Sequence, residues 1–304
     1  MKKLIRNLRE KMPSRAQVAG AIQGVIGDKL PQRLQTSMHF IGGDKPLKGH
    51  VVLFVHGSAD TEAGWQAKKG ELNFGDQLLL DFGVASVYVR YNSGLAVSEN
   101  GEKLATLITE FTEKHRAVRK LTLIGHSMGG LVIHSALYHA QAQKLRWIKK
   151  VEQVFLIGTP HAGAPLAKIA DQGEQILQFI PNPITLIAAS VVGLRSRGLK
   201  DLSRGEGGLP AGGNVLLPRV RYVFIAGGVQ KKRGGVINRL LGDGMVREPS
   251  AHRRAAEAGP RLAKLIPYLN SRAKVFVETV PGAGHLALRH SPAVYGVISG
   301  YFRA

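Results

Sequence analysis

Six short apolar runs, separated by segments of different periodicity, constrain the fold of this chain most strongly. Each run is rich in β-branched residues and ends in glycine or polar turn residues. Near-continuous apolar runs of this length are typical of strands covered on both faces, as in a parallel sheet. The predicted strands lie within His50–Gly57, Ala85–Asn92, Lys120–Ser127, Val151–His161, Val220–Gly228 and Ala273–His285.

Segments with helical periodicity lie between most of these runs. Glu99–Val118 places an apolar face opposite its charged residues, formed by Leu104, Leu107, Ile108 and Phe111. Gly129–Gln143 and Pro260–Leu269 follow similar patterns. Strand–helix–strand alternation predicts an α/β fold with a doubly wound, mostly parallel sheet, formed by residues 1–304 as a single domain.

One interval breaks this alternation. From Ala164 to about Pro218 no strand pattern appears; an apolar stretch interrupted by Pro181 and Pro183 leads into a glycine-rich segment. We interpret residues 164–218 as an inserted helical cap or lid, the alternative being an ordinary long crossover. Its apolar content favours a lid or a substrate wall.

The net charge of the chain indicates which chemical class of partner it favours. The formal net charge is +21 over 304 residues, which favours anionic partners such as lipid headgroups. We expect no nucleic-acid binding, because the basic clusters lack interleaved aromatic residues and a nucleic-acid motif. No apolar run reaches the roughly 18 residues of a membrane span. The basic N-terminal segment, residues 1–35, lacks a clear cleavage site, which favours a cytoplasmic protein over a secreted one.

The segment Gly125–Gly129 reads Gly-His-Ser-Met-Gly and matches the G-x-S-x-G pattern. It follows a predicted strand and begins a predicted helix, which is the context of a nucleophile elbow. Small neighbours allow strand and helix to pack closely around a serine held in a strained turn. We therefore predict that Ser127 is a nucleophile, the alternative being a glycine-rich turn with an incidental serine.

A serine hydroxyl needs a base, and the base needs an orienting acid, which follow the serine in the order acid, then histidine. His285 comes after the last predicted strand and is favoured over His290. Asp243 lies between glycines, between Ser127 and His285 in sequence, and is favoured over Glu248 and Asp201.

An oxyanion hole requires two backbone donors. One is expected from Met128, directly after the nucleophile. The other is expected from Ser58, in the loop after the first predicted strand, where Gly57 allows close approach and His56 would fix the loop.

Taken together, these segments resemble the α/β-hydrolase fold and, more closely, bacterial serine lipases and esterases. The resemblance extends from about Val51 to Leu288 and rests on "VHG", "GHSMGGL", "IGTPHAGAPLA", "GDGMV" and "GHLAL". It implies Ser127 as nucleophile, Asp243 as acid, His285 as base, and Ser58 and Met128 as oxyanion donors. Calcium-dependent relatives place an aspartate shortly after the catalytic histidine, where this chain has Leu286–Leu288, so a calcium site is not expected. Tyr91–Gly101 also looks like a family segment and has no assigned role.

The predicted reaction is hydrolysis of lipid-like or other apolar acyl esters through an acyl-enzyme, without cofactor or metal. The same triad would serve a thioesterase, an amidase or an acyltransferase. A third reading is a catalytically silent scaffold that binds an anionic membrane or partner through its charge. The complete serine–acid–histidine set argues against it.

Overall fold

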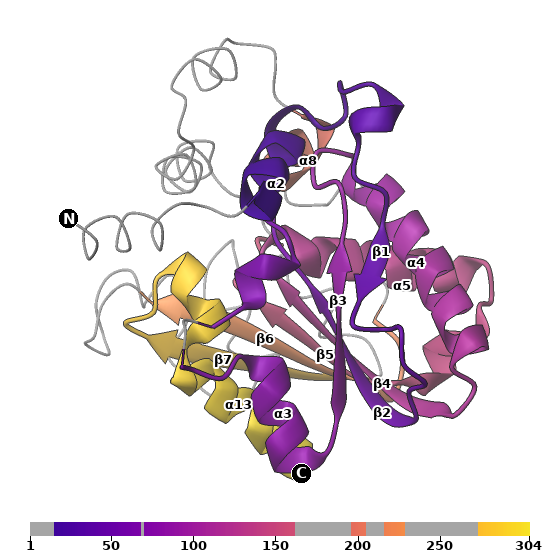
Figure 1. The fold of residues 1–304 in the computed structure, drawn as a ribbon. Helices are drawn as coiled ribbons and strands as arrows, with labels where there is room; N and C mark the ends of the chain where they lie inside the picture. The colour runs from indigo at the N-terminus through magenta and orange to yellow at the C-terminus, as the bar shows by residue number, and fades with distance from the viewer. Residues whose placement is uncertain (1–14, 68–69, 162–195, 205–215, 229–272) are drawn as a thin grey trace.

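Seven strands form one sheet in the computed structural model, which describes residues 15–67, 70–161, 196–204, 216–228 and 273–304 (Figure 1). The strand order is β1-β3-β2-β4-β5-β6-β7. The strands are β1 (His39–Ile41), β2 (Gly49–Val55), β3 (Ala85–Arg90), β4 (Val118–His126), β5 (Val151–Ile157), β6 (Arg221–Gly228) and β7 (Lys274–Pro281).

The sheet is parallel from β3 to β7, as predicted. All six predicted strands are present, with ends that differ by a few residues. The additional strand, β1, pairs antiparallel with the edge of β3, His39 opposite Arg90. Its three residues carry no apolar run, so the pattern that found the other strands did not indicate it.

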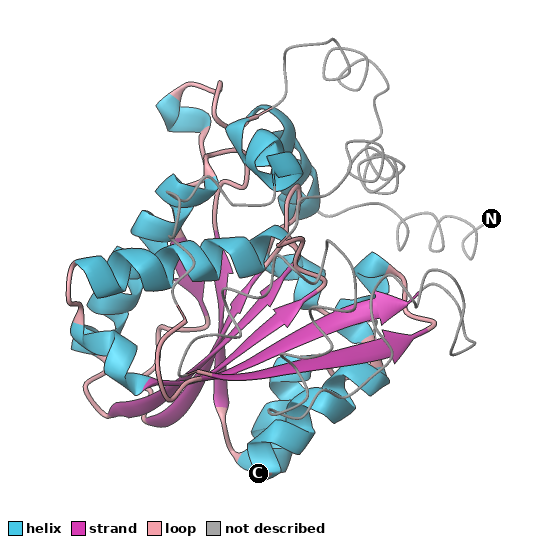
Figure 2. Ribbon diagram, turned by 180° about the vertical axis from the view of Figure 1, so that it is seen from behind, coloured by secondary structure: helices cyan, strands magenta, loops and turns pink. Residues whose placement is uncertain are grey.

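Helices cover both faces of the sheet, as Figure 2 shows from behind. On one face lie α4 (Val97–Lys114) and α5 (Met128–Ala142), and on the other lie α3 (Phe74–Phe82) and α13 (Pro292–Arg303). The remaining helices are α2 (Arg15–Ile26), α8 (Arg197–Arg204) and the short 3-10 helices η1 (Gln32–Leu34), η2 (Glu62–Trp65), η3 (Arg146–Lys150) and η4 (His285–His290).

Local signals in the sequence fix the ends of α3. The Asn73 side chain accepts a hydrogen bond from the Asp76 N–H at 3.0 Å, which satisfies one of the unpaired donors of the first turn. The helix ends at Gly83, whose φ of 65° lies in the left-handed region that glycine adopts without strain.

The apolar residues form one buried cluster on each face of the sheet. One contains Leu104 and Ile108 of α4 and Leu137 of α5, and the other contains Leu78 of α3 and Ile298 of α13. The central strands β2, β4 and β5 are therefore buried on both sides, which accounts for their near-continuous apolar sequences. Because each central strand is sandwiched in this way, its carboxyl end is held rigidly.

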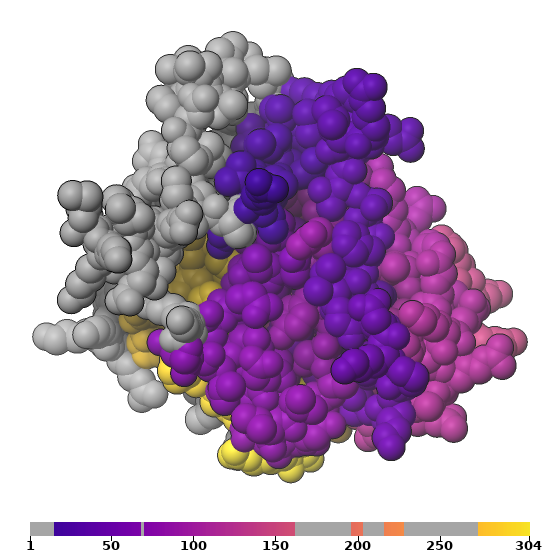
Figure 3. Space-filling model, viewed as in Figure 1, coloured from indigo at the N-terminus to yellow at the C-terminus, as the bar shows by residue number. Residues whose placement is uncertain are grey.

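The N-terminal part of the described chain packs on the body of the molecule rather than standing apart from it. The space-filling view shows the indigo N-terminal residues against the purple surface of the following segments (Figure 3). Gln23 of α2 donates to the carbonyl of Leu34 at 2.8 Å and accepts from the N–H of Thr36 at 3.3 Å. The first 14 residues of the predicted N-terminal segment lie outside the described residues.

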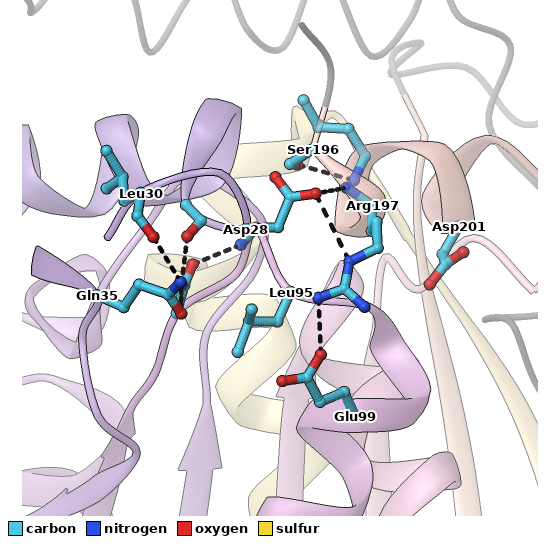
Figure 4. Close-up of polar contacts among 12 residues, drawn as sticks. Asp28, Leu30, Gln35, Leu95, Glu99, Ser196, Arg197 and Asp201 are labelled. Carbon is cyan, nitrogen blue, oxygen red and sulfur yellow. Dashed lines mark hydrogen bonds and ion pairs between the residues drawn. The ribbon is translucent and has the colours of Figure 1, made fainter. Parts of the chain in front are cut away.

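A polar junction joins α2 to α8 (Figure 4). The Ser196 hydroxyl donates to the carbonyl of Gly24 at 2.6 Å. The Arg197 backbone donates to Asp28 at 3.1 Å, and its guanidinium donates to Glu99 of α4 at 2.9 Å. Of the predicted cap, 164–218, only residues 196–204 and 216–218 are described. Ser196 and Arg197 therefore join the start of α8 to both the N-terminal segment and α4.

No helix in the described part of the chain is long and apolar enough to cross a membrane.

Candidate active site

Ser127 lies in a strained turn between β4 and α5. Its φ is 53° and its ψ is −125°, a conformation that side-chain-bearing residues rarely adopt. Its N–H donates to the carbonyl of Ile157, the last residue of β5, at 2.8 Å. Strain of this kind persists only where the surroundings hold it, and it gathers at functional sites. The local geometry is that of the predicted nucleophile elbow.

The glycines beside Ser127 allow the strand and the helix to approach closely. A Cβ at Gly125 would lie 2.6 Å from the Gly130 nitrogen, and a Cβ at Gly129 would lie 2.3 Å from the Val55 carbonyl oxygen. Real Cβ atoms do not approach so closely. The spacing of the glycines is therefore a packing requirement of the turn and is not incidental.

Met128, the predicted oxyanion donor after the serine, is the first residue of α5 and is fully buried. The N–H groups of a helix's first turn have no intrahelical partner, and the helix dipole places partial positive charge there. This end of α5 is suited to stabilise negative charge that develops beside Ser127.

The loop after β2 lies against the elbow, as the second predicted donor requires. A Cβ at Gly57 would be only 3.1 Å from the Cβ of Ser127. Ser58 follows directly, and its hydroxyl is buried without a hydrogen-bond partner among the described residues. His56, predicted to fix this loop, is fully buried, stacks on Tyr91 with 4.2 Å between ring centroids, and its Nδ1 lies 2.8 Å from the Gly57 carbonyl.

His285 begins η4 just after β7 and lies beside the elbow. A Cβ at Gly158, the residue after Ile157, would lie 3.1 Å from its Nδ1. Its carbonyl oxygen lies 3.0 Å from Nε2 of His126, the neighbour of Ser127, and the two rings are 4.7 Å apart. Burial lowers the pKa of His285 to about 4, so its ring is neutral at pH 7, the state required of a general base.

Ser127 and His285 thus share one end of the sheet, although no hydrogen bond joins their side chains within the described structure. Catalytic hydrogen bonds are often long without substrate and tighten when it binds. His290, the alternative base, is exposed at the end of η4.

The acid of the predicted triad, Asp243, and its alternative Glu248 lie outside the described residues. The third candidate, Asp201, is buried on α8 and accepts a hydrogen bond from the Val97 N–H at 2.9 Å. Val97 is the first residue of α4, so Asp201 caps that helix.

The sequence of Tyr91–Gly101 indicates no role for this segment. In the structure Tyr91 and Ser93 bond to the backbone of the loop after β2, at His56 and Ala59. No spacing rule indicated this, because the partners are 35 and 34 residues apart.

Among the described residues, no group of three or more His, Asp or Glu side chains is placed to hold a metal ion. The chemistry available at this site is that of a serine beside a neutral histidine and two candidate backbone donors.

The family described as "Putative serine esterase (DUF676)" matches residues 45–207, more than half of the chain. This match spans the elbow and the loop after β2. No curated protein matches the chain.

Several solved structures are similar to this chain. The mature lipase BlEst2 of Bacillus licheniformis is 18% identical, with a TM-score of 0.50, and the alignment covers 86% of this chain and 97% of the lipase. A carboxylesterase of Nitrososphaera gargenis is 13% identical, with a TM-score of 0.47, covering 88% and 93%. A thioesterase of Streptomyces coelicolor, RedJ, is 16% identical, with a TM-score of 0.45, covering 86% and 91%. The likeness to the lipase shows an α/β-hydrolase fold.

Proposed function

Because the chain belongs to this family of serine esterases and has the α/β-hydrolase fold, we propose that it hydrolyses carboxylic esters through an acyl-enzyme on Ser127. The family makes it a serine hydrolase. That the substrate is an ester, and that Ser127, His285, Asp243, Ser58 and Met128 have the roles given below, is what we propose. The observation that carries it is the strained backbone of Ser127, at φ 53°, beside a half-buried and neutral His285.

In the proposed reaction the Ser127 hydroxyl attacks the ester carbonyl while His285 accepts its proton. The backbone N–H groups of Ser58 and Met128 stabilise the oxyanion. His285 then protonates the leaving alcohol, and the acyl group remains on Ser127. Water, deprotonated by His285, releases the acid. Asp243 is proposed to orient the His285 imidazole through its carboxylate.

The proposed substrates are small-molecule or lipid-like esters with apolar acyl groups. The apolar sequence of the predicted cap, 164–218, supports an apolar acyl site. The net charge of +21 supports contact with anionic lipid surfaces. We also propose that the protein is located in the cytoplasm. We further propose that residues 1–304 form one hydrolase domain with an inserted cap, about 164–218, and a basic N-terminal segment, 1–35.

The test is hydrolysis of p-nitrophenyl esters of increasing acyl length, with Ser127→Ala as the inactive variant. We expect hydrolysis by the native chain, a loss of roughly 10⁴-fold or more in kcat for Ser127→Ala, and labelling of Ser127 by a fluorophosphonate. Rates that rise with acyl length indicate a lipase-like acyl site, and a preference for short chains indicates a carboxylesterase.

A native chain that is labelled at Ser127 but cleaves only thioesters or amides would overturn the ester assignment and keep the nucleophile. A chain that is neither labelled nor active on any of these substrates would overturn the proposal and favour the silent scaffold.

A further inference from the structure

Ala59, directly after Ser58, has a left-handed backbone with a φ of 55°. For a residue with a side chain this conformation costs about 1–2 kcal/mol relative to ordinary backbone. It therefore persists only where its surroundings hold it. Three contacts hold the loop around Ala59, each made by residues that are far from the loop in sequence.

The first contact comes from the turn after β3. The Ser93 hydroxyl oxygen accepts a hydrogen bond from the Ala59 N–H at 3.0 Å, and Ser93 is fully buried. This bond fixes the peptide unit between Ser58 and Ala59, because the Ala59 N–H belongs to it. Rotation of that unit would break the bond and deprive the buried Ser93 hydroxyl of this partner, which is costly.

The second contact comes from Tyr91. Its hydroxyl donates to the carbonyl oxygen of His56 at 2.8 Å, and its ring stacks on the His56 imidazole. Tyr91 and Ser93 thus bond to the loop on either side of Gly57 and Ser58. The two residues between the bonds are those predicted to approach Ser127.

The third contact is made by helix α2, whose backbone at two glycines packs directly against the backbone of the loop. A Cβ at Gly24 would lie 2.4 Å from the Cα of Ala59, and a Cβ at Gly20 would lie 2.6 Å from the carbonyl oxygen of Asp60. Gly20 and Gly24 are four residues apart and share one face of the helix. That face is pressed directly against the loop.

We propose that Tyr91, Ser93 and the Gly20–Gly24 face of α2 are positioning elements that hold the loop His56–Asp60 for oxyanion stabilisation. This inference rests on the proposed function, in which the Ser58 N–H is a donor. The three contacts act through the backbone of the loop and touch no substrate. Tyr91–Gly101 and α2 therefore share one proposed role, which is to hold the loop His56–Asp60 in place.

This role predicts a distinctive kinetic effect. A loop that is less well held binds the ground-state ester nearly as before but stabilises the oxyanion less, so kcat falls while KM is retained. Removing a whole oxyanion donor costs about 10²–10³-fold in kcat. Loosening one through Ser93→Ala is expected to cost about a tenth of that, on the order of 10-fold or more.

The experiment measures kcat, KM and the inhibition constant of an alkyl boronic acid, which forms a tetrahedral adduct on the serine. The variants are Ser93→Ala, Tyr91→Phe and Gly24→Ala. Each has a matched control whose substituted group makes its own contacts outside the loop His56–Asp60. Ser299→Ala removes the hydroxyl of another buried serine, which donates a hydrogen bond to the carbonyl oxygen of Gly296. Tyr88→Phe removes a hydroxyl that donates to Asn73.

Gly296→Ala is the control for Gly24→Ala, because a Cβ at Gly296 would meet nothing within 4 Å. The proposal predicts that the three variants lose kcat and boronate affinity by similar factors, keep KM within about two-fold, and still label with fluorophosphonate. The controls are expected to keep both kcat and boronate affinity. Thermal unfolding of every variant is measured beside the kinetics.

Variants that lose no more kcat than their controls, or that lose kcat without losing boronate affinity, would overturn the positioning role while Ser127-dependent hydrolysis stands. Should Ser93→Ala fail to fold, Gly24→Ala and Tyr91→Phe carry the test. A native chain without Ser127-dependent hydrolysis or labelling would instead overturn the proposed function, and this inference with it.

Discussion

The guanidinium of Arg289 is ion-paired with the carboxylate of Asp60, 229 residues earlier in the chain. The side chains are only 10% and 15% exposed. Arg289 lies on η4, the helix that begins with His285, and Asp60 lies in the loop that contains Ser58. Burial lowers the pKa of Arg289 to about 10, which leaves it charged at neutral pH. The pair therefore connects the candidate base with the candidate oxyanion loop.

We expect Asp60→Asn to destabilise the fold by about 3–5 kcal/mol, because it leaves a buried guanidinium without its counter-charge. Chemical denaturation of the native and variant chains measures this difference. Glu152→Gln is the matched control, since its partner Lys120 forms an exposed pair, worth about 0–1 kcal/mol. Equal effects of the two substitutions would show that the Arg289–Asp60 pair contributes little.

A methyl group at Gly125 should separate β4 from α5. Its Cβ would lie 2.6 Å from backbone nitrogen of Gly130, which has no flexible end to move aside. Gly125→Ala is expected to lower the thermal unfolding temperature and the rate of fluorophosphonate labelling together. Gly300→Ala, where a Cβ meets nothing within 4 Å, should change neither. An unaltered labelling rate in Gly125→Ala would contradict the tight packing of this turn.

The roles of two aspartates can be separated by their effects on rate and on stability. Asp201 caps α4 through its bond to the Val97 N–H, so Asp201→Ala should cost about 0.5–2 kcal/mol of stability and retain kcat. Asp243→Ala should lower kcat strongly, as expected for the group that orients a catalytic histidine. Denaturation and ester hydrolysis are measured on both. A reversed pattern, with kcat lost in Asp201→Ala, would make Asp201 the acid.

Acid should unfold this chain between about pH 6.5 and pH 4. Burial lowers the pKa of His56, His134 and His285 from 6.5 to about 4, and it also lowers the pKa of His126 well below its usual value. In this window the unfolded chain binds protons that the folded chain does not, so stability falls as the pH falls. Each of the first three contributes about 3 kcal/mol, together comparable with the whole stability of a typical domain.

Circular dichroism during acid titration measures this transition. His134→Gln, which removes one buried titrating ring away from the proposed chemistry, should shift its midpoint to lower pH if the variant folds as stably as the native chain at pH 8. A transition centred well below pH 4 in the native chain would show that carboxylates, and not histidines, govern acid unfolding.

Much of the fold followed from local sequence patterns. The central strands are buried on both faces, so their apolar runs were visible, and the glycines around Ser127 marked a turn whose strain the structure confirms. The edge strand β1 was missed because three residues, half-exposed at the edge, show no such run.

The same local patterns do not predict the contacts that surround the candidate site. Ser93 with Ala59 and Arg289 with Asp60 join residues 34 and 229 positions apart, and nothing in the spacing of either pair indicates the other member. Such partners are defined only once the strands are ordered in the sheet. A serine and a histidine could be chosen from rules of chain order, whereas the residues that hold the loop could not.

The Arg197 backbone N–H donates to Asp28, which lies 169 residues earlier in the chain. This bond therefore forms only after Arg197 has been synthesised. At about 5–20 residues per second, a ribosome adds the second partner roughly 10–30 s after the first. During that interval α2, with glycines at positions 20 and 24 that weaken an isolated helix, has none of its contacts with residues 196–204. The N-terminal helix is thus the first of the described helices to be made, but it gains its contacts with residues 196–204 only after they have been synthesised.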